Sequence, residues 1–342
     1  MEDPQASLFV MDYDGRVVAT IGGRGEKEGK RSYNRSTMSY RSPGSSIKPL
    51  TSYGPAIAND LVHWSSVIRD APIMKVEGTP WPANYNSKPR DNGNVFLYYG
   101  LQQSLNTVAA NLVQQLTPQK SFDYATSIFK LSSLVKSQTG DDGMIYTDIA
   151  YSPLALGALT KGVYARDMAA AYAVYGNGGY YNEPYSYYSV YQNGTMDDGK
   201  ELLKNGSVNI RVMDEDSAYV MNRMMQRVVR YGTGRNISGS WSNMEVFGKT
   251  GTAESNRDVY FCGGTPYYVG ASWFGYDNNQ KLVGTQTGYA RSLWNKAMLA
   301  LHSGVEGKAF DKKGETRELE FCTASGELAT DKCPKTDVGV YK

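Results

Sequence analysis

Histidine is scarce in this chain, since only His63 and His302 occur among 342 residues. A hydrolase with a Ser-His-Asp triad needs a histidine beside its nucleophile, and a Gly-x-Ser-x-Gly turn often carries the serine. Neither histidine has such a turn as its partner, so we interpret both as ordinary surface or core residues. A nucleophilic serine in this chain therefore needs a different base.

Other absences narrow the class of protein. No stretch approaches the roughly 20 apolar residues of a membrane-spanning helix. The acidic start Met1-Glu2-Asp3-Pro4 lacks the apolar region of a secretory signal, so we expect any export signal to lie in sequence that precedes this chain. Basic residues are scattered and the net charge is +2, which argues against a nucleic-acid binder.

The three cysteines do not form a metal-binding pattern, because no two of them have C-x-x-C spacing. Cys322 and Cys333 flank a short polar loop. The sequence favours neither a disulfide bond between them nor two free thiols. Cys262 lies in an apolar run, and we predict that it is a small buried hydrophobe.

The hydrophobic pattern predicts strands near both ends of the chain and helices between them. A hairpin is expected at 7–20, around the turn Asp14-Gly15. Helices are expected at 45–57, 97–116, 120–134, 165–175, 214–230 and 293–303, and strands at 245–252, 267–276 and 281–286. The segment 72–94 is expected to be a long irregular loop, and the tail beyond 307 is expected to be loop-like. The pattern indicates an α/β sandwich whose sheet joins the two ends.

Ser45 and Lys48 form the first candidate motif. Ser45 follows Pro43-Gly44 at an expected helix start, and Lys48 lies one helical turn further on the same face. A lysine becomes a base when burial or nearby cations lower its pKa. The same Ser-x-x-Lys spacing recurs at Ser127 and Ser133, which we interpret as solvated helix faces. For Ser45 alone, a simple helix N-cap is the competing interpretation.

Two further motifs follow in order. Ser104 and Asn106 offer a hydroxyl for proton relay and an amide to anchor a substrate or Lys48, although a helix N-cap also explains them. The run Lys249-Thr250-Gly251-Thr252 ends an apolar strand, and Gly251 leaves room for a flat substrate at the strand edge. Thr250 and Thr252 suit a carboxylate, and Lys249 supplies positive charge. A strand-turn lysine is the alternative, but three unrelated motifs in this order are less expected than one shared site.

With these motifs, the sequence resembles the transpeptidase domain of class A penicillin-binding proteins, the bifunctional enzymes of wall synthesis. Further agreement over nearly the whole chain is found in Pro4-Gln5-Ala6, Asn34-Arg35, Ala171-Tyr172, Asn177-Gly178-Gly179, Gly232-Thr233-Gly234, Trp273-Phe274-Gly275-Tyr276-Asp277 and Ser325-Gly326. The resemblance implies an α/β sandwich like that of penicillin-binding proteins and serine β-lactamases, with a central antiparallel sheet from both chain ends, flanking helices and a helical subdomain. It implies one domain over 1–342, with sheet at about 1–30 and 244–305, a mainly helical region at about 45–235 and a tail at 306–342.

The resemblance also implies site roles. Ser45 would be the acylated nucleophile and Lys48 its general base, while Ser104 and Lys249 would move protons. Asn106 would orient the substrate and Lys48, and Thr250, Gly251 and Thr252 would hold the substrate at the strand. The backbone N–H groups of Ser45 and Thr252 would form the oxyanion hole. No cofactor or metal is implied.

The implied reaction is D,D-transpeptidation: attack on the D-alanyl-D-alanine amide of a peptidoglycan stem peptide, followed by transfer to an amine of a neighbouring stem. β-Lactams would trap the same serine. The family's glycosyltransferase domain and membrane anchor are not in this sequence, and the implied location is the outer face of the bacterial cytoplasmic membrane. Two alternatives stay open: a D,D-carboxypeptidase or serine β-lactamase, and a non-catalytic sensor of β-lactams or wall peptides.

Overall fold

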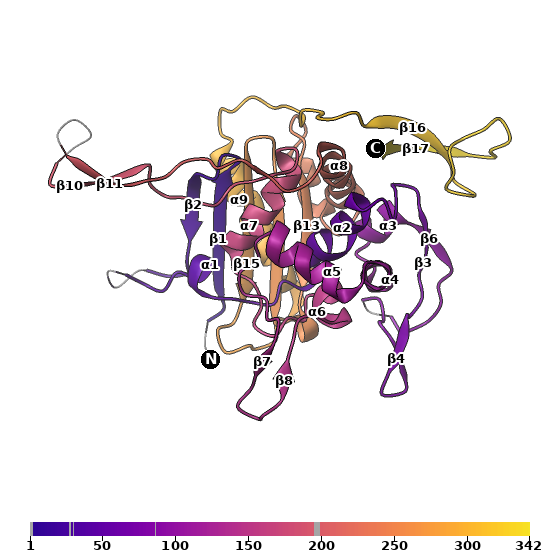
Figure 1. Ribbon diagram of the computed structural model, residues 1–342, viewed down its shortest axis with the longest axis horizontal. Coiled ribbons are helices and arrows are strands. Elements are labelled where there is room, and N and C mark those ends of the chain that lie inside the picture. Colours follow the sequence, from indigo (N-terminus) through magenta and orange to yellow (C-terminus); the bar gives the residue numbers. More distant parts are fainter. Residues whose placement is uncertain (1–2, 27–28, 30, 86, 195–198) are drawn as a thin grey trace.

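A five-stranded antiparallel sheet forms the centre of the computed structural model, which describes residues 3–26, 29, 31–85, 87–194 and 199–342. Its strand order is β13-β14-β15-β1-β2, so a strand from the start of the chain lies beside strands from near its end (Figure 1). The strands are β1 Gln5–Asp12, β2 Val17–Ile21, β13 Phe247–Thr252, β14 Asp258–Gly264 and β15 Tyr268–Gly275. The predicted α/β sandwich with a sheet from both chain ends is confirmed.

Helices cover both faces of this sheet. Alternate residues of β1 point to opposite faces, so Phe9 and Met11 join one hydrophobic core and Leu8 and Val10 join another. The larger core includes α7 (Ala165–Gly176) and α8 (Glu215–Tyr231), and the smaller one includes α9 (Tyr289–Leu301) around Trp294. Because both faces are covered, β1 is buried along almost its whole length.

A helical region packs beside the sheet and carries two of the three motifs. Its helices and helical turns are η1 Gly44–Ile47, η2 Pro49–Tyr53, α2 Gly54–Ala58, α3 Leu97–Gln102, α4 Asn106–Leu116, α5 Pro118–Asp123, η3 Tyr124–Ile128 and α6 Tyr151–Leu156. The remaining short helical segments are α1 Arg35–Met38, η4 Arg235–Ser240, η5 Glu254–Asn256 and η6 Gly284–Gly288.

In the part of the chain that the structure describes, six two-stranded hairpins or strand pairs surround this body. They are β3 Val67–Arg69 with β6 Asn94–Phe96, β4 Met74–Val76 with β5 Thr79–Trp81, β7 Gln138–Thr139 with β8 Ile145–Tyr146, β9 Tyr180–Tyr181 with β12 Ile210–Arg211, β10 Ser189–Gln192 with β11 Lys200–Lys204, and β16 Arg317–Cys322 with β17 Thr336–Tyr341. Figure 1 shows β10–β11 and β16–β17 at opposite ends of the long axis, and β7–β8 extending from the body.

Several sequence predictions of local structure were wrong. The strand expected at 281–286 is instead a loop and the 3₁₀ turn η6, because the Leu282 N–H donates to Asn256 O and Val283 faces solvent. Strand β14 was not predicted, since it is buried on both faces and shows no polar alternation. The helix expected at 97–116 divides into α3 and α4 at Ser104, whose φ is 60°. The expected helix at 45–57 divides into η1, η2 and α2.

The tail was predicted to be loop-like, but β16 and β17 pair over six residues. Phe321 on β16 is fully buried, and its ring packs edge-on against Phe96 and Tyr98. Cys322 and Cys333 are free thiols, and a hydrogen bond between them lowers the pKa of Cys322 to about 7. The tail therefore belongs to the main core, which Phe310, Phe321 and Val340 all join.

Truncation of the Phe321 ring tests its importance. We expect Phe321→Ala to lower the free energy of unfolding by about 3 kcal/mol, because it removes a fully buried ring. Val338→Ala on β17 is the control, since Val338 is 46% exposed and should cost much less. Urea denaturation measures both variants. Equal stability of the two would show that the Phe321 ring contributes nothing to the core.

Candidate active site

Ser45 is held against the end of strand β13 by two glycines. Gly44 has φ 50°, and a Cβ there would lie 2.3 Å from Thr252 O. A Cβ on Gly251 would lie 2.0 Å from Pro43 O. Only glycine fits at both positions, because any side chain would push the turn η1 away from the strand. This close approach brings the Ser45 backbone beside Thr252.

Ser104 lies between two buried lysines. The Lys48 ammonium donates to Ser104 O at 2.7 Å and to Asn106 Oδ1 at 2.7 Å. The Lys249 ammonium donates to Ser104 Oγ at 2.7 Å and to Thr250 O at 3.1 Å. The left-handed backbone of Ser104 ends α3 and turns its carbonyl and hydroxyl to the two lysines. The three motifs predicted from sequence therefore meet at one residue.

Burial changes the protonation of both lysines. Lys48 and Lys249 are completely buried. Burial lowers the pKa of Lys48 well below its usual range, and the neighbouring charge of Lys249 lowers this pKa further. Burial lowers the pKa of Lys249 to about 7. A large fraction of Lys249 can therefore be neutral at neutral pH, and the lowered pKa of Lys48 shifts it in the same direction, toward the neutral form that a lysine base requires.

The long segment 72–94 positions Asn106. Asn84 Oδ1 accepts from the Asn106 backbone N–H at 2.8 Å, and Asn106 Nδ2 donates to Ala83 O at 2.8 Å. Asn84 Nδ2 in turn donates to Asp70 Oδ1 at 2.7 Å. These bonds fix the amide so that its oxygen faces Lys48. The sequence pattern predicted a long irregular loop at 72–94, which was wrong in part because β4 and β5 form a hairpin within it. The pattern did not indicate Asn84 as a supporting residue.

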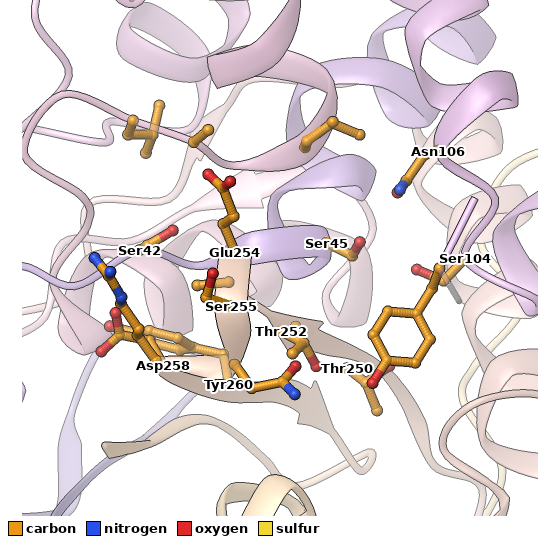
Figure 2. A pocket seen from close by; sticks show the side chains of 18 of the residues that line it. Ser42, Ser45, Ser104, Asn106, Thr250, Thr252, Glu254, Ser255, Asp258 and Tyr260 are labelled. Atoms are coloured by element: carbon orange, nitrogen blue, oxygen red, sulfur yellow. The ribbon is translucent and has the colours of Figure 1, made fainter. Parts of the chain in front are cut away.

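A cavity of about 1080 Å³ opens over these groups. Six of the predicted site residues line it: Ser45, Ser104, Asn106, Thr250, Gly251 and Thr252. Figure 2 shows Ser45 between Ser104 on one side and Glu254 on the other, with Thr250 and Thr252 along the strand (Figure 2). The other two predicted residues, Lys48 and Lys249, lie buried behind this surface.

The Ser45 and Lys48 side chains do not form a hydrogen bond within the described residues. Lys48 bonds to Ser45 through the backbone, where the Lys48 N–H donates to Ser45 O. The Lys48 ammonium is already engaged by Ser104 and Asn106. Catalytic hydrogen bonds are often long in a substrate-free site and tighten when substrate binds.

Thr233 and Arg291 complete the strand side of the cavity. The hydroxyls of Thr233 and Thr250 are 2.6 Å apart, and Arg291 Nη1 donates to Thr233 O at 2.9 Å. Burial lowers the pKa of Arg291. The sequence reasoning assigned neither residue, although Thr233 lies in the quoted run Gly232-Thr233-Gly234, which could have indicated it.

Other residues that the sequence analysis considered for a reactive role lie outside the active-site cavity. His302 is enclosed by aromatic rings, and its Nε2 is 2.8 Å from Thr265 Oγ1. Ser133, from a competing Ser-x-x-Lys copy, donates to Gly162 O. Cys262 is fully buried, as predicted, and burial raises the pKa of its thiol.

In the described part of the chain, no three His, Cys, Asp or Glu residues are grouped to hold a metal. No helix there is long and apolar enough to span a membrane.

The family described as the penicillin binding protein transpeptidase domain matches residues 6–300. The chain belongs to this family. Penicillin-binding protein 1A of Clostridium tetani is 32% identical, with 98% of this chain and 42% of that protein covered. Penicillin-binding protein 1A of Clostridium botulinum is 34% identical over 96% of this chain and 38% of that protein. The chain therefore spans about two fifths of the length of these relatives.

Solved structures show the same penicillin-binding fold. Penicillin-binding protein 1A from Haemophilus influenzae has a TM-score of 0.78 at 23% identity, covering 98% of this chain and 53% of that one. The PonA1 protein of Mycobacterium tuberculosis, solved in complex with penicillin V, has a TM-score of 0.74 at 22% identity, covering 92% and 82%. Because both identities are below 25%, these two structures show a shared fold and nothing more specific.

A methyl group at Gly251 tests the contact between η1 and β13. We expect Gly251→Ala to reduce acylation by penicillin at least tenfold, because the new Cβ would collide with Pro43 O and displace Ser45 from the strand. Overpacking of this kind also costs about 1–3 kcal/mol of stability. Labelling rates with a fluorescent penicillin measure the effect.

Gly206→Ala is the matched control, because nothing lies within 4 Å of a Cβ at that position. It should label at the rate of the unmodified protein. If Gly251→Ala also labels at that rate, the close approach of the two segments is not needed for reactivity.

Proposed function

We propose that this domain is a D,D-transpeptidase that cross-links peptidoglycan stem peptides through an acyl-enzyme on Ser45. The observation that carries the proposal is the buried lysine pair bridged by Ser104, at the base of a cavity that Ser45 lines. Family membership and the penicillin-binding relatives support the same activity. The lysine pair supplies a base that the scarce histidines cannot.

In the first half-reaction, Ser45 Oγ attacks the carbonyl carbon between two D-alanines and its proton passes to neutral Lys48. The negative charge that develops on the carbonyl oxygen would be stabilised by the backbone N–H groups of Ser45 and Thr252. The C–N bond then breaks, and the leaving amine takes a proton through Ser104 from the lysine pair. D-Alanine leaves, and the peptide stays as an ester on Ser45.

In the second half-reaction, an amine of another stem peptide attacks the ester carbonyl and gives up a proton to the lysine pair. The ester bond breaks, Ser45 regains its proton, and a new peptide bond joins the two stems. Asn106 would hold the donor amide, while Thr250 and Thr252 would bind its terminal carboxylate beside the Arg291 charge. A β-lactam would acylate Ser45 in the same way.

Hydrolysis of the same acyl-enzyme is the second candidate, as in a D,D-carboxypeptidase or a serine β-lactamase. Glu254 favours it, because this exposed carboxylate lines the cavity and could activate water. The other lining carboxylate, Asp258, accepts from Trp273 Nε1 at 2.7 Å. A penicillin adduct that persists for many minutes supports the transpeptidase, whereas rapid turnover supports a lactamase. A sensor would form the adduct but yield no cross-linked or trimmed peptide.

We also propose the setting in which the domain works. Because the chain covers about two fifths of its relatives, the rest of the protein would supply the glycosyltransferase domain and membrane anchor of a class A enzyme. The domain would then act on the outer face of the bacterial cytoplasmic membrane. Its partners would be donor and acceptor stem peptides, with β-lactams as inhibitors.

Removal of the proposed nucleophile gives the most direct test. We expect Ser45→Ala to abolish covalent labelling by a fluorescent penicillin, because it removes the hydroxyl that would form the ester. Peptide mass mapping of the unmodified protein should locate the adduct on Ser45. Ser127→Ala, which alters an exposed copy of the motif, should label normally. An adduct on Ser127 or Ser133 would contradict the assignment.

The lysine pair predicts the pH dependence. Both lysines have lowered pKa values, Lys249 to about 7, so their neutral forms become more abundant as pH rises through the neutral range. We expect the acylation rate to rise with pH and to level off well below pH 10, as measured by stopped-flow labelling. Lys249→Met should slow acylation about 100-fold and move the rise to higher pH, because Lys48 loses the neighbouring charge that lowers its pKa.

Lys200→Met on the exposed hairpin strand β11 is the control and should leave the profile unchanged. A wild-type rate that rises steadily to pH 10 would indicate an ordinary lysine and would rule out the proposed base.

A further inference from the structure

A second cavity, of about 570 Å³, adjoins the active-site cavity. Tyr40 and Lys161 line both, so the two spaces share a wall. The second cavity is otherwise formed by 132–138, which follow the helical turn η3, and by Tyr164 and Arg166 at the start of α7. Neither the motifs nor the proposed reaction assigns this space a role.

The second cavity is basic. Its lining contains Lys136, Lys161 and Arg166 and no carboxylate among the described residues. Arg166 is paired with Asp167, with 3.1 Å between Nε and Oδ1. Lys136 and Lys161 have no ion pair within the described part of the chain, and both are exposed. Two uncompensated positive charges therefore face a space large enough for part of a peptide, and they favour an anionic ligand.

The walls of this cavity are fixed by hydrogen bonds. Arg41 and Val163 exchange two backbone hydrogen bonds, of 3.0 and 2.9 Å. These bonds join the chain segment that carries Tyr40 to the segment that carries Lys161. Ser133 Oγ donates to Gly162 O at 2.6 Å, so the segment 132–138 is bonded to the segment that carries Lys161. The Tyr40 and Tyr164 rings pack edge to face at 5.1 Å. A preformed site of this kind loses little entropy when a ligand binds.

The direction of the donor peptide leads toward this cavity. In the proposed reaction its terminal carboxylate lies at Thr250 and its reacting carbonyl lies between Ser45 and Thr252. The residues N-terminal to that carbonyl must then extend past Thr252, away from Ser104. Figure 2 shows Ser42, Asp258 and Tyr260 on that side of Ser45. Tyr260 lines the active-site cavity on this side, and its hydroxyl donates to Val163 O at 3.2 Å, two residues along the chain from Lys161.

We propose that the second cavity binds a carboxylate carried by the donor peptide N-terminal to its D-alanyl-D-alanine end. This inference rests on the proposed function and adds a selectivity for acidic donors. Lys136 and Lys161 attract the carboxylate, and Tyr40 offers a flat surface to the peptide as it passes from one cavity to the other. Because both lysines are exposed, the preference weakens as salt screens their charge.

Competition with a fluorescent penicillin tests the proposal in the full chain. Two synthetic donors end in D-Ala-D-Ala and differ only two positions before the first D-alanine, where one has a glutamyl and the other a glutaminyl residue. The concentration of each donor that halves the labelling rate of Ser45 is measured. We expect the acidic donor to compete about fivefold better in the unmodified protein. In Lys136→Gln/Lys161→Gln the two donors should compete equally.

Lys200→Gln/Lys204→Gln on β11 is the matched control, because it removes the same charge from the projecting hairpin. This variant should keep the fivefold preference, and thermal unfolding checks that both variants fold. The proposal is wrong if the unmodified protein shows no preference, if Lys136→Gln/Lys161→Gln retains it, or if the β11 control loses it. Failure of penicillin to label Ser45 would instead overturn the proposed function itself.

Discussion

The burial of two lysines beside one serine is the constraint on which the rest of the site depends. A buried ammonium loses its hydration, so it must either find hydrogen-bond acceptors or lose its proton. The structure supplies the acceptors from Ser104 and Asn106, and it lowers both pKa values. The backbone turn at Ser104 lets one residue offer its carbonyl to Lys48 and its hydroxyl to Lys249. The fold and the proposed chemistry therefore share one set of contacts.

That constraint also explains why residues so distant in the chain must pack so closely. Lys48 follows the turn η1, and Lys249 lies on β13 some 200 residues later. The two elements meet only because Gly44 and Gly251 have no side chains. Strand β13 is in turn held in place by β14 and, through β15, by β1 at the start of the chain. The sheet that joins the two ends thus fixes the position of Lys249 relative to Ser45 and Lys48.

Motif residues could be predicted from the sequence, whereas their supporting residues could not. The Ser-x-x-Lys spacing indicated that Lys48 lies near Ser45, and the order of the motifs indicated a shared site. Nothing local marks Asn84 as the residue that fixes Asn106, because that contact forms across a loop without periodic pattern. The same limit hid β14, which is buried on both faces, and β16–β17, whose buried residues Phe321 and Val340 stand in a polar tail. Short-range patterns report local structure, and these contacts are long-range.

The shape of the active-site cavity bears on which substrates the domain can select. A β-lactam is small and needs only the part between Thr250 and Ser45, so the site could acylate with the rest of the cavity empty. A stem peptide is longer, and in the proposed reaction the chain on its N-terminal side would lie along the wall formed by Tyr40 and Lys161. Selectivity for a natural donor would then come from charges outside the reacting centre, where binding energy can orient the substrate without changing the chemistry at Ser45. A β-lactam could then inhibit the domain by reacting at Ser45 without contacting the part of the cavity that would select the peptide.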